Sequence, residues 1–131
     1  MKIERSDVFA LKELGYGEGC RYIETMHKRE MAIRMKELDI RNKSEAEKVA
    51  SKLGGKLVDF ILNEATEWAI AFSPINDLNI YYLFQRYSPE FEDEIITFYG
   101  KETANTAIPI DDLYDFTRLY ANALVRGSKQ K

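Results

Sequence analysis

The sequence has a single cysteine, a single histidine and only three prolines among its 131 residues. One cysteine cannot form a disulfide within the chain, so Cys20 agrees with a reducing compartment and gives no support to a disulfide-stabilised fold. If Cys20 and His27 share one helix, they lie about 10 Å apart along its axis, because each residue adds about 1.5 Å. A nucleophile activated by histidine is therefore improbable, and we expect a non-catalytic protein.

Long hydrophobic runs are also missing. No apolar stretch approaches the ~20 residues of a membrane-spanning helix, and the first fourteen residues are charged throughout, unlike a signal peptide. Hydrophobic residues make up 45% and charged residues 31% of the sequence, which is typical of a soluble globular protein. We expect a cytoplasmic protein with one α+β domain, residues 1–131, in which residues 127–131 are a disordered tail.

Charge of one sign does not dominate the chain, but the two halves differ. The net charge is −3; residues 1–56 carry 13 Lys and Arg against 10 Asp and Glu, whereas residues 57–131 carry 6 against 12. The acidic half holds the strand patterns described below. Because phosphate binding needs clustered positive charge, this charge distribution argues against a nucleic-acid surface on the sheet.

Four short segments with strand character follow one another between residues 57 and 100. They read LVDFIL (57–62), WAIAF (68–72), NIYYLFQRY (79–87) and EIITFYG (94–100), with apolar or aromatic residues on both faces. Short turn-forming segments separate them, which predicts an antiparallel meander. A single helix over residues 45–66 is the alternative for the first segment, although Gly54 and Gly55 would cost such a helix about 2 kcal/mol.

Helical patterns occupy most of the remaining chain. They cover residues 7–14, residues 18–38, a segment opened by a Ser44-x-x-Glu47 capping box, and a last segment from Pro109 to a stop at Gly127. The fold class is therefore α+β: N-terminal helices, a four-stranded antiparallel meander sheet, and a C-terminal helix packed on the sheet.

The helix predicted over residues 18–38 has two apolar stripes. Cys20, Ile23, His27, Met31, Met35 and Leu38 form the first, and Tyr22, Met26 and Ile33 form the second. Two separate stripes are typical of a helix with two neighbours, one of which could be a second copy of the chain.

This helix also carries two patterns with chemical meaning. Glu24-x-x-His27-x-x-Glu30 has metal-ligand types on adjacent turns, but helix-bundle metal sites need ligands from several helices, so we expect no metal and no cofactor. A basic stripe, Arg21, Lys28, Arg29 and Lys36, has glutamates beside it and is interpreted as a solvated helix face. Contact with nucleic acid through this stripe remains an alternative function.

The aromatic third strand carries the main functional hypothesis. We expect a protein-binding or assembly module whose contact residues are Tyr81, Leu83, Gln85, Tyr87, Glu90, Glu92 and Glu94. Few helices are available to cover both faces of so apolar a sheet, which favours a homodimer that closes one face, or another protein in that place. A small-molecule-binding protein or an enzyme, with a pocket between sheet and helices, is the second hypothesis.

Overall fold

The structure is a computed structural model that describes residues 2–17, 20–87 and 91–130, and it has the predicted α+β class. Its helices are α1 (Cys20–Glu37), α2 (Lys43–Lys52) and α3 (Ile110–Lys129), with short 3-10 helices η1 (Arg5–Asp7), η2 (Leu11–Glu13) and η3 (Lys101–Asn105). Its strands are β1 (Lys2–Ile3), β2 (Val8–Phe9), β3 (Lys56–Leu57), β4 (Asp59–Phe60), β5 (Thr66–Ile75), β6 (Leu78–Gln85) and β7 (Glu94–Gly100). None of the helices in the described ranges is long and apolar enough to cross a membrane.

The main sheet has five antiparallel strands in the order β2-β7-β6-β5-β3. Strands β5, β6 and β7 form the meander that their alternating sequence predicts. The two edges are short strands from outside the meander: Phe9 pairs with Tyr99 on one side, and Leu57 pairs with Ile70 on the other. The expected count of four strands is therefore exceeded by one in this sheet.

The segment expected as one strand over residues 57–62 is divided between two sheets. Lys56 and Leu57 pair with β5, and the Val58 N–H still donates to the Ala69 carbonyl, but Phe60 pairs in parallel with Ile3 of β1. The alternative of a helix over residues 45–66 is wrong, because α2 ends at Lys52 and Gly54 follows with a φ of +80°. A positive φ is the conformation that glycine adopts without steric cost.

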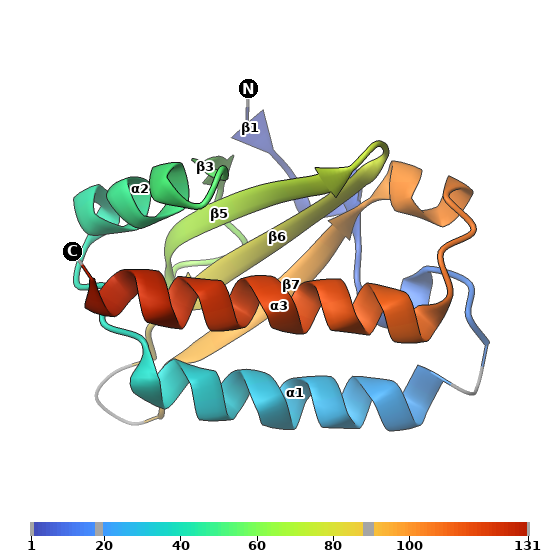
Figure 1. The fold of residues 1–131 in the computed structure, drawn as a ribbon, viewed down its shortest axis with the longest axis horizontal. Helices are drawn as coiled ribbons and strands as arrows, with labels where there is room; N and C mark the ends of the chain where they lie inside the picture. The colour runs from blue at the N-terminus through green and yellow to red at the C-terminus, as the bar shows by residue number, and fades with distance from the viewer. Residues whose placement is uncertain (1, 18–19, 88–90, 131) are drawn as a thin grey trace.

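Three helices cover one face of the main sheet, and α3 is packed on that sheet as expected. In Figure 1 α1 and α3 lie side by side in front of the strands and run in the same direction, from blue to cyan and from orange to red. The core beneath them includes stacked Trp68 and Phe84, with ring centroids 5.3 Å apart. The Tyr82 hydroxyl donates to the Thr117 carbonyl of α3, which ties the central strand to this helix.

The opposite face of the sheet is covered by the chain itself. Phe60, which is 1% exposed, packs on Phe98 and Tyr81 with ring centroids 5.6 and 6.1 Å away, and the Arg5 guanidinium lies 4.7 Å from the Phe98 ring centroid. Val58, Leu62 and Ile3 extend this second cluster. No second subunit is needed to bury this face, which removes the reason given above for a homodimer there; the oligomeric state itself stays a prediction.

Two expected helix boundaries near the N-terminal half are wrong. Residues 7–14 do not form one helix, because Val8 and Phe9 are extended and pair with β7 between two 3-10 turns. Helix α2 begins at Lys43, and its N-cap is Asn42, two residues before the proposed Ser44 cap. The Asn42 side chain accepts the Glu45 N–H, and the Glu45 carboxylate accepts the Arg41 N–H at 2.8 Å. A capping arrangement is present, but it starts at Asn42.

The expected helix end at Gly127 is also wrong, and so is the disordered tail for residues 127–129, because α3 continues to Lys129. A Cβ on Gly127 would lie 3.2 Å from the Val49 side chain, so glycine here permits close approach of α3 to α2. The next residue, Ser128, is fully buried; its hydroxyl donates to the Val125 carbonyl and accepts the Asp39 N–H. These contacts hold the last turn of the helix on the domain.

Replacing Phe60 with alanine should lower the free energy of unfolding by about 3–5 kcal/mol, because it leaves a cavity between residues 58–62 and the sheet face that they cover. Urea denaturation measures this loss. Ile61→Ala is the matched control, since Ile61 is 55% exposed and its truncation should change stability by less than about 0.5 kcal/mol. Equal losses for the two variants would contradict the burial of this face by Phe60.

Candidate functional site

A cavity of about 450 Å³ lies between α1, β7 and the segment around η2. The apolar part of its wall includes Leu11, Met31, Ile95 and Tyr99, and its polar part includes His27 and Thr97. Charged side chains of both signs also line it: Arg5, Lys12, Glu24, Lys28, Asp93 and Glu94. The site therefore combines an apolar wall with hydrogen-bonding groups and charges of both signs. Small-molecule pockets likewise place polar groups within an apolar lining.

His27 is the central polar group of this wall. Its side chain is 8% exposed; Nε2 lies 3.2 Å from the Thr97 hydroxyl of β7, and the ring meets Tyr114 of α3 edge-on at 6.2 Å. Its Nδ1 is buried and has no hydrogen-bond partner among the described residues. A buried polar atom without a partner carries a desolvation cost, which the surrounding packing has to offset.

Burial, and to a smaller extent the positive charge of Lys28, lower the pKa of His27 to about 4. The imidazole is therefore neutral at neutral pH. In a neutral ring one nitrogen carries the proton and the other accepts, so Nδ1 offers either a donor or an acceptor according to the direction of the Thr97 bond.

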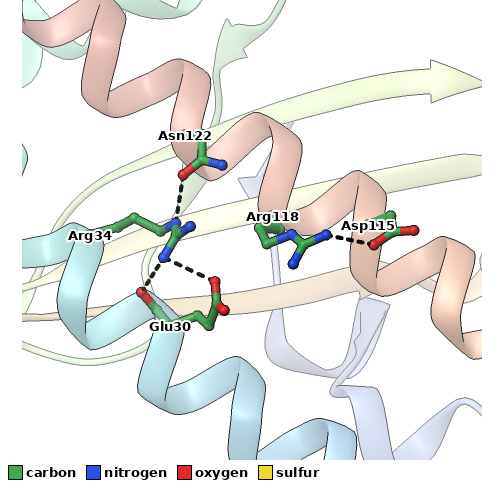
Figure 2. A network of polar contacts seen from close by, with 5 residues as sticks. All are labelled: Glu30, Arg34, Asp115, Arg118 and Asn122. Atoms are coloured by element: carbon green, nitrogen blue, oxygen red, sulfur yellow. Dashed lines mark hydrogen bonds and ion pairs between the residues drawn. The ribbon is translucent and has the colours of Figure 1, made fainter.

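A polar network between α1 and α3 holds the helix that carries His27. Figure 2 shows that the Arg34 guanidinium donates to the Asn122 side chain at 2.7 Å and forms an ion pair with Glu30 at 3.0 Å. On α3 itself, Arg118 pairs with Asp115 at 2.9 Å. The Arg34 contacts cross between the helices and so fix the position of α1 relative to α3.

The proposed pattern Glu24-x-x-His27-x-x-Glu30 is divided by this network. His27 and Glu24 line the cavity, whereas Glu30 is paired with Arg34. Burial, and then the negative charge of Glu30, raise the pKa of the Tyr114 hydroxyl on α3. No group of three or more potential metal ligands is gathered anywhere in the described part of the chain.

The expected partner-binding residues do not form one continuous surface. Leu83 and Gln85 are fully buried, and the Gln85 amide donates to Asn63 and accepts a hydrogen bond from Thr66. Tyr81 and Tyr87 are half-buried, whereas Glu92 and Glu94 are exposed. Glu90 lies outside the described residues. The buried pair occupies the central strand β6, whose second face is covered by residues 58–62.

The basic stripe of α1 lies at the surface, as the sequence indicates. Arg21, Lys28, Arg29 and Lys36 are all exposed, and Lys28 also lines the cavity. In the other apolar stripe, Tyr22 and Ile33 are 72% and 53% exposed. The stripe that contains His27 and Met31 packs against the rest of the domain instead. Helix α1 therefore has one buried apolar side and one apolar side that faces outward.

Sequence reasoning allowed a pocket between sheet and helices as an alternative, but it missed the residues that line this cavity and the pairing of His27 with Thr97. One signal was available: Thr97 alternates with Ile95 and Tyr99 on the helix-facing side of β7. A hydroxyl on an otherwise apolar side needs a hydrogen-bonding partner when it is buried. The only histidine of the chain, placed on the inward stripe of a helix, was the available candidate.

Comparisons with protein-family models, with curated proteins and with solved structures give no significant match for this chain.

Folding stability should fall as the pH drops from about 6.5 to about 4, because the unfolded state takes up a proton on His27 in this window and the folded state does not. The loss reaches about 3 kcal/mol below pH 4. Urea denaturation at a series of pH values measures it, and His27→Gln is the reference, since the difference between the two proteins cancels the carboxylates common to both.

The lowered pKa of His27 can also be measured directly by NMR. The chain contains one histidine, so its ring protons give a single titration curve, which should have a midpoint near 4 in the folded protein. A midpoint near 6.5, the value of an exposed histidine, would show that the ring is not buried as described.

Proposed function

We propose that this chain is a non-catalytic binding protein whose ligand occupies the cavity between α1 and β7. The observation that carries the proposal is a cavity of about 450 Å³ whose wall combines the imidazole of His27 with apolar side chains of η2, α1 and β7. Cavities of about 300–1,000 Å³ are typical of small-molecule sites. The proposal develops the second hypothesis of the sequence analysis.

The lining of the cavity suits a small, mainly apolar molecule with one hydrogen-bonding group. Leu11, Met31 and Ile95 would contact its apolar part. His27 and Thr97 would meet its polar group, because they are the hydrogen-bonding pair on the buried side of the wall. Charges of both signs also line the cavity, so the lining does not select a cationic over an anionic ligand.

The lowered pKa of His27 favours a role in ligand binding over a role as general base in a reaction. A general base works best when its pKa lies near the operating pH, and the pKa of this imidazole is lowered to about 4. At neutral pH such a ring is a weak base and an effective hydrogen-bonding group. A cytoplasmic location is part of the proposal, since the single cysteine agrees with a reducing compartment.

The dye 1-anilinonaphthalene-8-sulfonate, an aromatic anion that fluoresces in apolar surroundings, should bind the folded chain at one site. Ala32→Trp should weaken binding at least about tenfold, because Ala32 is exposed on α1 and lines the cavity, which the indole would fill. Fluorescence titration gives the affinities. Glu37→Trp places the same side chain at an exposed position of α1 that is not among the lining residues, and should leave the affinity unchanged.

The NMR signals of the His27 ring locate the bound dye, and they should shift on titration with the native protein. Equal binding by the two tryptophan variants, or ring signals that do not move, would contradict a ligand site at this cavity.

Contact with another protein or a second copy through the end of β6 and the acidic loop is a second candidate function. The observation that favours it is Phe91, which is 72% exposed beside Glu92 and Glu94. Aromatic side chains are frequent anchors of protein interfaces, and the half-buried Tyr81 and Tyr87 would extend the contact. This candidate keeps the exposed part of the surface expected from the sequence and omits Leu83 and Gln85.

If this surface joins two copies, light scattering should give twice the chain mass for the native protein. Tyr81→Ser combined with Tyr87→Ser should give a folded monomer, with circular dichroism as the check on folding. A native monomer, or a dimer that persists in the double variant, would exclude self-association through these tyrosines.

A further inference from the structure

Strand β7 is paired along its full length on one edge only. Strand β6 pairs with it from Glu94 to Tyr99, whereas β2 pairs with its outer edge only at Tyr99 and Gly100. No other strand of the described chain lies beside residues 94–98 on the outer side, which is called the open edge below. Because alternate residues of an antiparallel strand direct their N–H and C=O groups to the same side, part of this backbone points outward without a partner strand.

The segment that follows β2 turns away from the open edge. Ala10 is the N-cap of η2, and its N–H donates to the Glu13 carboxylate at 2.7 Å instead of continuing the pairing with β7. Leu11 is then buried in the core beneath the helices. This turn leaves the edge of β7 uncovered beyond Tyr99 and places η2 as a wall beside it.

The cavity of the candidate site follows the open edge. Every residue from Asp93 to Tyr99 lines it. Its lining also comes from both sides of the sheet: Met31 belongs to the core beneath the helices, whereas Phe98 and Leu62 belong to the cluster on the opposite side. A space that contacts both sides of a sheet at one strand lies beside the edge of that strand.

The sequence of β7 has none of the features that keep an edge strand from pairing with another chain. Its pairing with β6 has no bulge, and between Glu94 and Gly100 it contains only isoleucine, threonine, phenylalanine and tyrosine. Charged residues, proline and bulges are the common protections of an edge. The opposite edge differs, because β5 continues past its last pair with β3, at Ala71, through Pro74, which has no N–H.

We propose that the ligand of this cavity is an extended peptide segment of another molecule, which joins the main sheet as a strand beside the open edge of β7. Its backbone pairs with residues 94–98, and one of its apolar side chains contacts Leu11 and Met31. Because successive side chains of a strand point to opposite faces, the apolar residues of such a peptide recur at every second position. In this mode of recognition main-chain hydrogen bonds supply affinity, and pockets for alternate side chains supply specificity.

The walls of the cavity favour a single strand over a second copy of the chain. Paired strands lie about 4.8 Å apart, so an added strand has to enter between α1 and η2, which both line the cavity. A lone peptide carries no further elements into this space. The open edge of a second copy would bring its own α1 and η2 to the same place.

This inference rests on the proposed function, that a ligand occupies the cavity, and it names the class of that ligand. The apolar group that the cavity receives is then a side chain of the peptide. The inference differs from the second candidate interface, which uses Tyr81 and Tyr87 of β6 and its end.

The probe is the peptide Lys-Val-Thr-Val-Thr-Val-Lys, acetylated and amidated at its ends, with valine at every second position. It should displace 1-anilinonaphthalene-8-sulfonate from the native chain, because both occupy the cavity, and the displacement gives its affinity. Ala32→Trp should weaken peptide binding at least about tenfold, since the indole fills this space. Glu37→Trp, outside the lining, should leave it unchanged.

Two N-methylated forms of the probe separate backbone pairing from side-chain contact. One form is methylated at the nitrogens of the three valines, and the other at those of the two threonines, so each blocks one edge of the extended peptide. One form should bind at least about tenfold more weakly than the probe and the other with the same affinity, because only one edge faces β7.

Hydrogen exchange measured by NMR reports on the protein side of the contact. In the free chain, amides of residues 94–98 that bond to β6 should be protected and should alternate with amides that exchange quickly. The probe should slow the exchange of the fast set at least about tenfold and leave the protected set unchanged.

Dye that binds the cavity but is not displaced by the probe would overturn the inference and leave the proposed function in place. Equal affinities for the probe and its two methylated forms would do the same, because side chains alone would then hold the peptide. If neither dye nor probe binds, both proposals fail. Protection of residues 94–98 that rises with protein concentration, in the absence of the probe, would overturn the inference and assign the open edge to a second copy.

Discussion

The burial of the central strand β6 on both faces is the constraint on which the other elements depend. Ile80, Tyr82 and Phe84 point to the helices, while Leu83 and Gln85 point to the opposite side, and all five are at most 2% exposed. An apolar strand of this kind must be covered twice, because each exposed face would leave hydrophobic area in water. The helices cover one face, and the segment that crosses from β3 to β4 covers the other.

The helices cover the sheet less completely near β7, and the candidate ligand site lies there. Helix α1 is held against α3 by Arg34 and against β7 by the hydrogen bond between His27 and Thr97. These polar contacts are directional, so they fix the distance of α1 from α3 and from β7. The cavity lies beside α1, next to the apolar wall around Met31. The burial that makes this wall apolar is also what keeps His27 neutral.

The outer surface of the helical layer exposes apolar residues beside charges at two separate places. The exposed charges one helical turn from Ile33 are of both signs, Arg29, Lys36 and Glu37. Those at the groove between the end of β5 and the first half of α3 are two aspartates, Asp112 and Asp115. Both the cavity and these surfaces are consequences of one arrangement: helices that pack on the sheet by one side only.

The sequence by itself determined the α+β class, the meander of β5, β6 and β7, and the two long helices, because each depends on a local period of two or 3.6 residues. The tertiary structure decided the rest. Phe60 pairs beside Ile3, and Phe9 pairs beside Tyr99, across separations in the chain that no local period records. The same reason explains the candidate site: Thr97 and His27 are 70 residues apart, and only the packing of α1 on β7 makes them neighbours.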